Sequence, residues 1–190
     1  MRKIISFMHV SLDGFVSGPH GELNWAKVDQ ELFEHIGERC KKGDSALYGR
    51  KTFQMMESYW PEAGKKPNAT RHDIEHSAWY NGIRKIVLST TLNAADFSNT
   101  TVVSDQIADH INALRHEDGG EILLFGSPTA THYLLNQNLI DGFWLFLNPT
   151  ILGQGVSLFK DVTQRIGLKL LPEGRRFSNG VTELNYEIER

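Results

Sequence analysis

Apolar and polar residues alternate along the chain in blocks that predict strands and helices in turn. Short β-branched or uniformly apolar runs, typical of buried strands, alternate with stretches whose apolar side chains recur at the spacing of one helix face. Strands are therefore expected at residues 3–10, 45–49, 84–90, 100–104, 121–126 and 140–152. Helices are expected at residues 29–41, 50–60, 71–82, 105–120 and 127–138.

This alternation predicts an α/β fold with a mostly parallel sheet and helices on its faces. Residues 167–189 are expected to close it with an antiparallel hairpin that turns at Ser178–Gly180. Residues 11–25, rich in Gly, Asp, Ser and Pro, predict a long loop, and Pro61 is expected to end the second helix. No repeat or linker is visible, so residues 1–190 are expected to form a single domain.

Composition and charge bear on whether the protein binds nucleic acid or a membrane. The formal net charge is −3, with 23% charged residues, which gives no general reason to expect nucleic-acid binding. The apolar run at residues 3–10 is far shorter than the ~18 residues that a membrane span requires. Cys40 is the only cysteine, which excludes an internal disulfide and fits a reducing compartment. We therefore expect a cytoplasmic protein without a nucleic-acid or membrane partner.

Three of the predicted strands end alike, with Gly or Ser followed by hydroxyl-bearing or cationic residues. In open α/β sheets ligands bind outside the carboxyl ends of the strands, where helix N-termini offer free N–H groups to a phosphate. Taken singly, each group is explained by a cap and a turn, with Ser127 as N-cap. Taken together, the three groups make an anion-binding site as good an explanation as caps and turns. Its residues are Gly49, Arg50, Lys51 and Thr52, then Ser89, Thr90 and Thr91, then Gly126, Ser127, Pro128 and Thr129.

Other candidates carry weaker signals. His72 and His76 lie four residues apart on a predicted helix, but their neighbouring carboxylates point elsewhere, so they are expected to be surface histidines and no metal site is expected. Trp25 closes the first loop and could wall a pocket, although packing explains it slightly better. No nucleophile motif of a hydrolase is visible.

Five segments together resemble the dihydrofolate reductase-like superfamily in order and spacing. They are SLDGFVSGPHGELNW, ALYGRKTFQMM, KIVLSTTL, EILLFGSPT and LIDGFWLFLNPTILGQGVSLF. The sequence is most similar to the branch related to the C-terminal reductase domain of bacterial riboflavin biosynthesis enzymes. This resemblance implies a three-layer fold with a central, mostly parallel sheet of about eight strands, flanked by helices and ending in an antiparallel hairpin.

The resemblance also implies NADPH as the cofactor. By position, the GRKT stretch and the residues after the fourth strand hold the adenosine side, and the GSPT stretch holds the pyrophosphate, where the family commonly has two glycines. The first loop flanks the nicotinamide. The implied residues are Val10, Leu12, Asp13 and Gly14, then Gly49, Arg50, Lys51 and Thr52, then Leu88, Ser89 and Thr90, then Gly126, Ser127, Pro128 and Thr129.

The implied activity is hydride transfer to a C=N or C=O group of a small heterocycle or a ribosylaminopyrimidine. Asp13 is the candidate proton donor, with fixing of its loop as the alternative. Dihydrofolate reductases bind the pterin through an acidic residue of the first helix, and Asp29, Glu31 and Glu34 lie in that region without a spacing that singles one out. Asp29, together with Trp25 at the end of the first loop, is the candidate for substrate binding. The alternatives are a nucleotide-binding module without turnover and a flavin-binding reductase. The apolar stretch FWLFLNPTIL predicts a homodimer.

Overall fold

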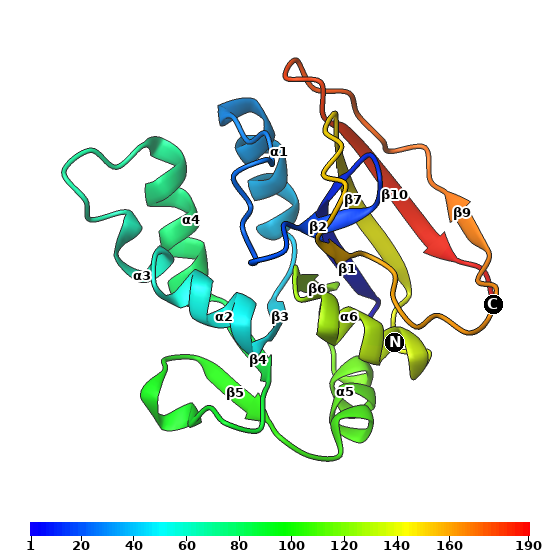
Figure 1. The fold of residues 1–190 in the computed structure, drawn as a ribbon. Helices are drawn as coiled ribbons and strands as arrows, with labels where there is room; N and C mark the ends of the chain where they lie inside the picture. Colours follow the sequence, from blue (N-terminus) through cyan, green and yellow to red (C-terminus); the bar gives the residue numbers. More distant parts are fainter.

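An eight-stranded sheet forms the centre of the protein, and the computed structural model describes all residues, 1–190. The strand order is β5-β4-β3-β6-β1-β7-β10-β9 (Figure 1). Neighbours from β5 to β7 are parallel, while β10 is antiparallel to both β7 and β9, so the predicted fold class is confirmed. The strands are β1 Ile4–Ser11, β3 Ser45–Gly49, β4 Arg84–Leu88, β5 Thr100–Val103, β6 Ile122–Phe125, β7 Gly142–Asn148, β9 Leu168–Leu170 and β10 Thr182–Ile188.

Helices cover both faces of this sheet (Figure 1). Ile4 and Met8 of β1 join one core with α5 and α6, whereas Ile5 joins the other core with α1, α2 and α4. Successive side chains of a strand point to opposite faces, so a strand covered on both sides reads as a nearly continuous apolar run. The helices are α1 Gln30–Cys40, α2 Arg50–Glu57, α3 Trp60–Ala63, α4 Arg71–Gly82, α5 Ile107–His116 and α6 Pro128–Asn136. None of them has the length and apolar character needed to cross a membrane.

Two connections differ from the sequence prediction. The helix expected at residues 50–60 ends at Glu57, and Pro61 lies in the first turn of α3. Proline is tolerated in a first turn because the N–H it lacks would have no helical partner there, so here it begins a helix instead of ending one. The first loop contains a short strand, β2 Phe15–Ser17, which pairs with β8 Val156–Ser157.

The C-terminal segment turns where the sequence predicts. The Gly180 N–H donates to the Phe177 carbonyl (3.0 Å), and Gly180 has φ +90°, a conformation that glycine adopts without strain. The apolar stretch that predicts a dimer lies mainly in β7, which pairs with β1 on one side and β10 on the other. Six of the seven residues of β7 are already buried within a single copy of the chain. Exposed apolar side chains occur instead on the edge strand β9, at Leu168 and Leu170.

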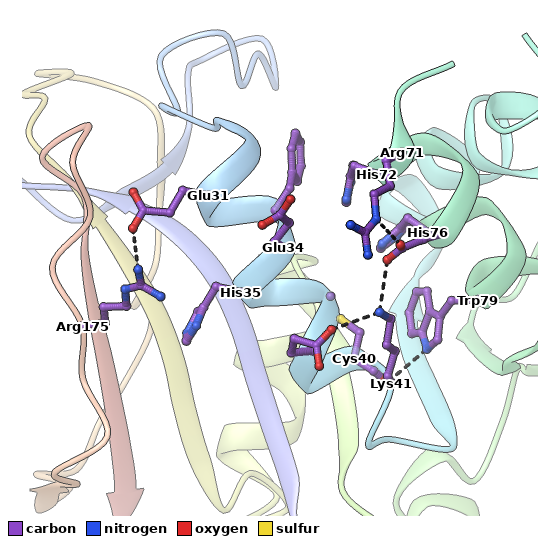
Figure 2. Close-up of a pocket in the computed structure, with 14 residues that line it drawn as sticks. Glu31, Glu34, His35, Cys40, Lys41, Arg71, His72, His76, Trp79 and Arg175 are labelled. Atoms are coloured by element: carbon purple, nitrogen blue, oxygen red, sulfur yellow. Dashed lines mark hydrogen bonds and ion pairs between the residues drawn. The ribbon is translucent and has the colours of Figure 1, made fainter.

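A groove of about 370 Å³ runs along α1 and α4 (Figure 2). The charged groups on its rim pair with one another. Glu31 accepts a hydrogen bond from Arg175 (2.5 Å), and the Lys41 ammonium lies 3.1 Å from Glu75. None of the strand-end residues of the predicted anion site lines this groove.

The histidines of α4 are not surface residues, and that expectation is wrong. His76 is 8% exposed, and the His72 ring stacks on Phe33 with centroids 3.9 Å apart. Burial lowers the pKa of His76 to about 3, because the charged form loses its hydration. Packing against α1 and Trp60 buries His76 and half-buries His72, and both rings line the groove along α1 and α4.

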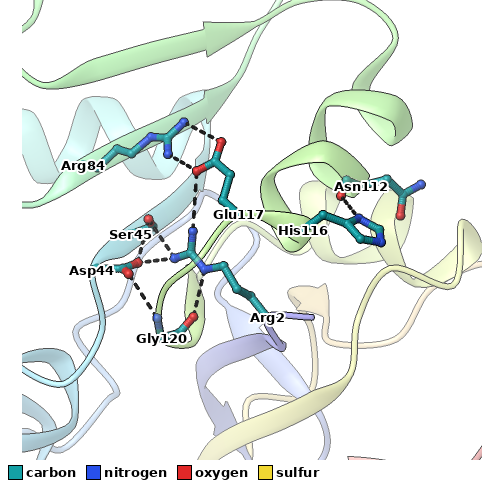
Figure 3. A network of polar contacts seen from close by, with 8 residues as sticks. All are labelled: Arg2, Asp44, Ser45, Arg84, Asn112, His116, Glu117 and Gly120. Carbon is teal, nitrogen blue, oxygen red and sulfur yellow. Dashed lines mark hydrogen bonds and ion pairs between the residues drawn. The ribbon is translucent and has the colours of Figure 1, made fainter.

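A polar network closes the amino edge of the sheet (Figure 3). The guanidinium of the buried Arg2 donates to the Asp44 carboxylate and to the Gly120 carbonyl, the latter at 2.9 Å. Glu117 accepts from Arg84 (2.5 Å) and lies 4.0 Å from Arg2. Arg2 and Asp44 precede β1 and β3, Arg84 begins β4 and Glu117 follows α5, so the network fastens the amino ends of three strands to one helix.

Candidate functional site

The three strand ends singled out in the sequence meet at the carboxyl edge of the sheet. Strands β4, β3 and β6 are parallel neighbours, and Gly49 is in register with Leu88. The Gly49 N–H donates to Ser127 Oγ at 2.7 Å, although the two residues are 78 positions apart. The Thr52 side chain lies against Gly126, 3.3 Å from where a Cβ would stand. The GRKT and GSPT stretches therefore form one site.

Two helix N-termini open at this site. Helix α2 begins at Arg50 and α6 at Pro128, and neither has a side-chain cap. Ser127 holds the predicted N-cap position of α6, but its hydroxyl accepts the Gly49 N–H instead of capping the helix. The partial positive charge of both helix ends is thus directed at the same edge, an arrangement that attracts a phosphate.

The loop before α6 is held in an unusual backbone conformation. Gly126 and Ser127 both lie in the left-handed region, with φ +52° and +57°. This conformation costs free energy for Ser127, and the hydrogen bond to Gly49 offsets it. A Cβ on Gly49 would stand 3.0 Å from Ser127 Oγ, so glycine permits the close approach of the two loops.

The cations of the site are exposed and unpaired. Arg50 donates only a long hydrogen bond to Gln54 Oε1 (3.4 Å), and neither Arg50 nor Lys51 has a carboxylate within ion-pair distance. A charge left uncompensated beside two helix N-termini suits a dianionic phosphate. Thr129, at the start of α6, adds an exposed hydroxyl.

The residues that follow β4 differ in exposure, and their hydroxyl groups make different contacts. Ser89 is buried, and its hydroxyl accepts the N–H groups of Thr91 and Leu92, both at 3.2 Å. Ser89 therefore closes the turn that follows the half-buried Leu88, whereas Thr90 is exposed at the same edge. Thr91 is exposed too, so both threonines present a hydroxyl at this edge.

The first loop leaves β1 at this edge, beside β6. Val10 is buried, Leu12 is 61% exposed and Gly14 has φ +87°. Asp13 accepts hydrogen bonds from Ser11 Oγ (2.7 Å) and from the main-chain N–H groups of Leu152 (3.1 Å) and Gly153 (2.7 Å).

These bonds lower the pKa of Asp13 to about 2, with the Ser11 hydrogen bond as the largest cause. The carboxylate is ionised at neutral pH and ties the loop after β7 to the end of β1. The geometry favours loop fixing over proton donation for Asp13.

Trp25 and Asp29 each make a local contact. The Asp29 carboxylate caps α1 by accepting the Leu32 N–H at 2.9 Å. The half-buried Trp25 donates from Nε1 to the Glu22 carbonyl at 3.1 Å. Neither contact reaches the strand ends, so these two residues organise the segment that leads into α1.

Two polar residues of this edge were not singled out in the sequence. His9 directly precedes Val10 on β1, and Asn148, the last residue of β7, lies with its Nδ2 3.4 Å from His9 Nδ1. Strand periodicity could have placed His9 on the face opposite Val10. Its pairing with Asn148 is a long-range contact that the sequence does not reveal.

On the sheet face under α1, three residues lie side by side on the neighbouring strands β1, β7 and β10. His9 pairs with Phe146, and Phe146 pairs with Glu183. The His9 ring stacks on Phe146 with centroids 5.4 Å apart. The buried Glu183 accepts from Trp144 Nε1 (2.6 Å), and His35 of α1 contacts it at 2.9 Å. The fully buried Phe146 ring therefore lies between two polar residues, His9 and Glu183.

Comparisons with known proteins agree with this geometry. Residues 2–181 match the family described as the RibD C-terminal domain. The uncharacterized protein YyaP of Bacillus subtilis is 34% identical over 187 residues, covering 97% of this chain and 94% of that protein.

Two solved structures share the fold. One is a diaminohydroxyphosphoribosylaminopyrimidine deaminase/5-amino-6-(5-phosphoribosylamino)uracil reductase from Thermotoga maritima (TM-score 0.67, 15% identity), matched over 99% of this chain and 57% of that longer chain. The other is a pyrimidine reductase-like protein from Corynebacterium diphtheriae (TM-score 0.66, 14% identity), matched over 100% of this chain and 92% of that chain. With a family match over nearly all its length, the chain belongs to the RibD C-terminal domain family of dihydrofolate reductase-like proteins.

Proposed function

We propose that this protein is an NADPH-dependent reductase that acts on a small pyrimidine-type heterocycle. One observation carries the proposal. The uncapped N-termini of α2 and α6 are fastened together by the Gly49–Ser127 hydrogen bond, with Arg50 and Lys51 unpaired beside them. Family membership points to the same cofactor, because reductases of this family generally use NADPH.

The residues present fit that cofactor. Arg50 and Lys51 would hold the 2′-phosphate, and the N–H groups at the starts of α2 and α6 would hold the pyrophosphate. Gly49 and Gly126 let the two loops approach closely, because a Cβ at Gly49 would stand 3.0 Å from Ser127 Oγ and one at Gly126 would stand 3.3 Å from the Thr52 side chain. Leu12 and Gly14 would flank the nicotinamide at the end of β1.

NADPH held there would supply the hydride that reduces the carbon of a C=N or C=O group, and the heteroatom of that group would take up a proton from water. The chain orients the reaction through the first loop, whose position Asp13 fixes by accepting the Leu152 and Gly153 N–H groups. Asp13 itself stays ionised and does not provide the proton.

A reductase assay tests the proposal. We expect purified protein to consume NADPH in the presence of 5-amino-6-(5-phosphoribosylamino)uracil, the substrate in the name of the Thermotoga maritima relative. Arg50→Ala should lose this activity at low NADPH and recover it as NADPH is raised. NADPH binding without consumption, with this compound and with related aminopyrimidines and pteridines, would favour a binding module. A yellow preparation would favour a flavin protein.

We also propose a homodimer, now through the edge strand β9. Its Leu168 and Leu170 are 37% and 55% exposed, and an uncovered edge strand offers free hydrogen-bonding groups to a second copy. Light scattering at micromolar concentration should give the dimer mass, and Leu170→Lys should give a monomer. A monomeric wild-type protein would contradict the proposal.

A further inference from the structure

His9 occupies the sheet face under α1, two residues before β1 ends at Ser11. It is half-buried, stacked on Phe146 at 5.4 Å and set edge-on to Phe7 at 5.9 Å. The neighbouring Val10 points into the opposite core. The imidazole therefore stands at the carboxyl edge on the side where β1 and α1 face each other.

The hydrogen bonds of Asn148 determine which ring nitrogen of His9 carries the proton. Asn148 Oδ1 accepts the main-chain N–H of Lys27 (2.8 Å), which leaves the amide Nδ2 as the group that faces His9. Nδ2 donates to the Phe146 carbonyl (2.9 Å) and lies 3.4 Å from His9 Nδ1. Since an amide nitrogen can only donate, Nδ1 must accept, and a neutral ring then carries its proton on Nε2.

The Nε2–H group of His9 has no partner in the protein. Nε2 makes no hydrogen bond, and it is not among the buried polar atoms without a partner, which include Nε2 of His72 and of His76. It is therefore open to solvent or to a ligand. Burial of the ring lowers the pKa of His9 to about 4, so the imidazole is neutral at physiological pH.

We infer that His9 is the hydrogen-bond donor that positions the substrate of this reductase, presenting Nε2–H to the acceptor nitrogen or oxygen of the group being reduced. The inference rests on the proposed function. A neutral donor polarises a C=N or C=O bond and favours hydride attack on its carbon. It does not give up its own proton, because a neutral imidazole is a very weak acid, and water remains the proton source. The site thus selects substrates whose reducible group carries an unprotonated acceptor.

Nuclear magnetic resonance of the full chain with 15N-labelled histidine tests the assignment without a substrate. At pH 7 we expect His9 to be neutral, with the proton on Nε2. NADPH should shift the His9 Nε2–H resonance, whereas 2′,5′-ADP, which has no nicotinamide, should bind without shifting it. A proton on Nδ1, a charged ring, or a His9 resonance unmoved by bound NADPH would overturn the inference.

Two substitutions give an independent readout. His9→Phe keeps the ring stacked on Phe146 and removes the donor, and kcat with 5-amino-6-(5-phosphoribosylamino)uracil should fall about ten- to a hundredfold. His9→Gln keeps an amide donor and should recover most of that loss. NADPH affinity should stay within about twofold in both. An unchanged kcat in His9→Phe would overturn the inference.

A failure of His9 is distinguishable from a failure of the proposed function. If His9 is not the donor, both nucleotides still bind and the protein still consumes NADPH. If neither NADPH nor 2′,5′-ADP binds, the proposed function fails and the role of His9 fails with it.

Discussion

At the amino edge of the sheet, Arg2, Asp44, Glu117 and Arg84 pair with one another, whereas at the carboxyl edge Arg50 and Lys51 have no carboxylate partner. The buried Arg2 satisfies neighbouring main-chain and side-chain acceptors. At the other edge, two helices begin without side-chain caps, and Ser127 is held in a left-handed conformation.

The difference shows how one sheet separates stability from recognition. Paired charges and satisfied carbonyls hold the amino ends of the strands together. Unpaired cations, free helix ends and a strained turn contribute little to stability and are what an anionic ligand requires. Substitutions at the two edges should therefore affect different measurements.

The largest effect is expected at the amino edge. Arg2→Ala leaves the Gly120 carbonyl and Ser45 hydroxyl without their donor, and Asp44 without its cation. We expect the free energy of unfolding to fall by roughly 2–4 kcal/mol, the scale for breaking a buried charged group's contacts. Urea denaturation measures this. NADPH affinity should be unchanged while the variant is folded, and a selective loss of cofactor binding would break the comparison.

At the carboxyl edge, Arg50→Ala should leave stability within about 0.5 kcal/mol, because Arg50 is exposed and unpaired. Its NADPH affinity should fall by roughly 10- to 150-fold, as one charge-assisted contact to phosphate is worth about 1.5–3 kcal/mol. NADH affinity should change little. Arg71→Ala, at an exposed arginine of α4 in an i,i+4 pair with Glu75, is the matched control. Equal losses for both cofactors would show that Arg50 does not contact the 2′-phosphate.

Lowering the pH should reduce the free energy of unfolding through His9 and His76, whose imidazole rings are neutral in the folded protein. The ion pairs of the amino edge contain no such group. The pKa values of His9 and His76 are lowered by burial to about 4 and about 3, so the unfolded chain binds more protons than the folded one as pH falls below about 6.5.

Stability should therefore rise with pH over this window, and each imidazole should cost about 1 kcal/mol between pH 6.5 and 5.5. Urea denaturation at both pH values should show a smaller pH effect for His76→Leu than for the wild type. His110→Gln, at an exposed histidine, should keep the full effect. An identical pH effect in His76→Leu would contradict the buried neutral state.

The smallest effect is the difference in stability expected between two variants at the turn before α6, Ser127→Ala and Ser127→Gly. Ser127→Ala removes the acceptor of the Gly49 N–H but keeps the left-handed strain, and should cost about 1–2 kcal/mol. Ser127→Gly loses the same bond but relieves the strain, so its stability should stay within about 1 kcal/mol of the wild type. Thermal unfolding of the two variants side by side tests this order, and a less stable glycine variant would show that the strain is negligible.

Much of the fold could be predicted because its signals are local. Buried strands such as β6 Ile122–Phe125 read as apolar runs, and the glycines at their ends, such as Gly49 and Gly126, mark the carboxyl edge of the sheet. Arg50 and Lys51 could be picked out as candidates because three strand ends share a pattern of Gly or Ser followed by hydroxyls or cations, and because the GRKT stretch resembles the family.

The remaining features depend on contacts that are distant in sequence. Asn148 sets the His9 tautomer from 139 residues away, and it is oriented by Lys27 at a separation of 121. The burial of His76 depends on how α4 packs against α1 and Trp60. Residue type and periodicity carry no signal for such pairings. Asp13 was recognised as important, but only its three hydrogen bonds show that it fixes a loop.

The most direct test of the carboxyl edge as a phosphate clamp is a pair of titrations of the purified protein with NADPH and NADH, followed by tryptophan fluorescence at low and high salt. The account predicts that NADPH binds at least about tenfold more tightly than NADH, and that added salt removes most of this advantage by screening the 2′-phosphate from Arg50 and Lys51. Equal affinity for the two cofactors at both salt concentrations, or no binding of either, would contradict it.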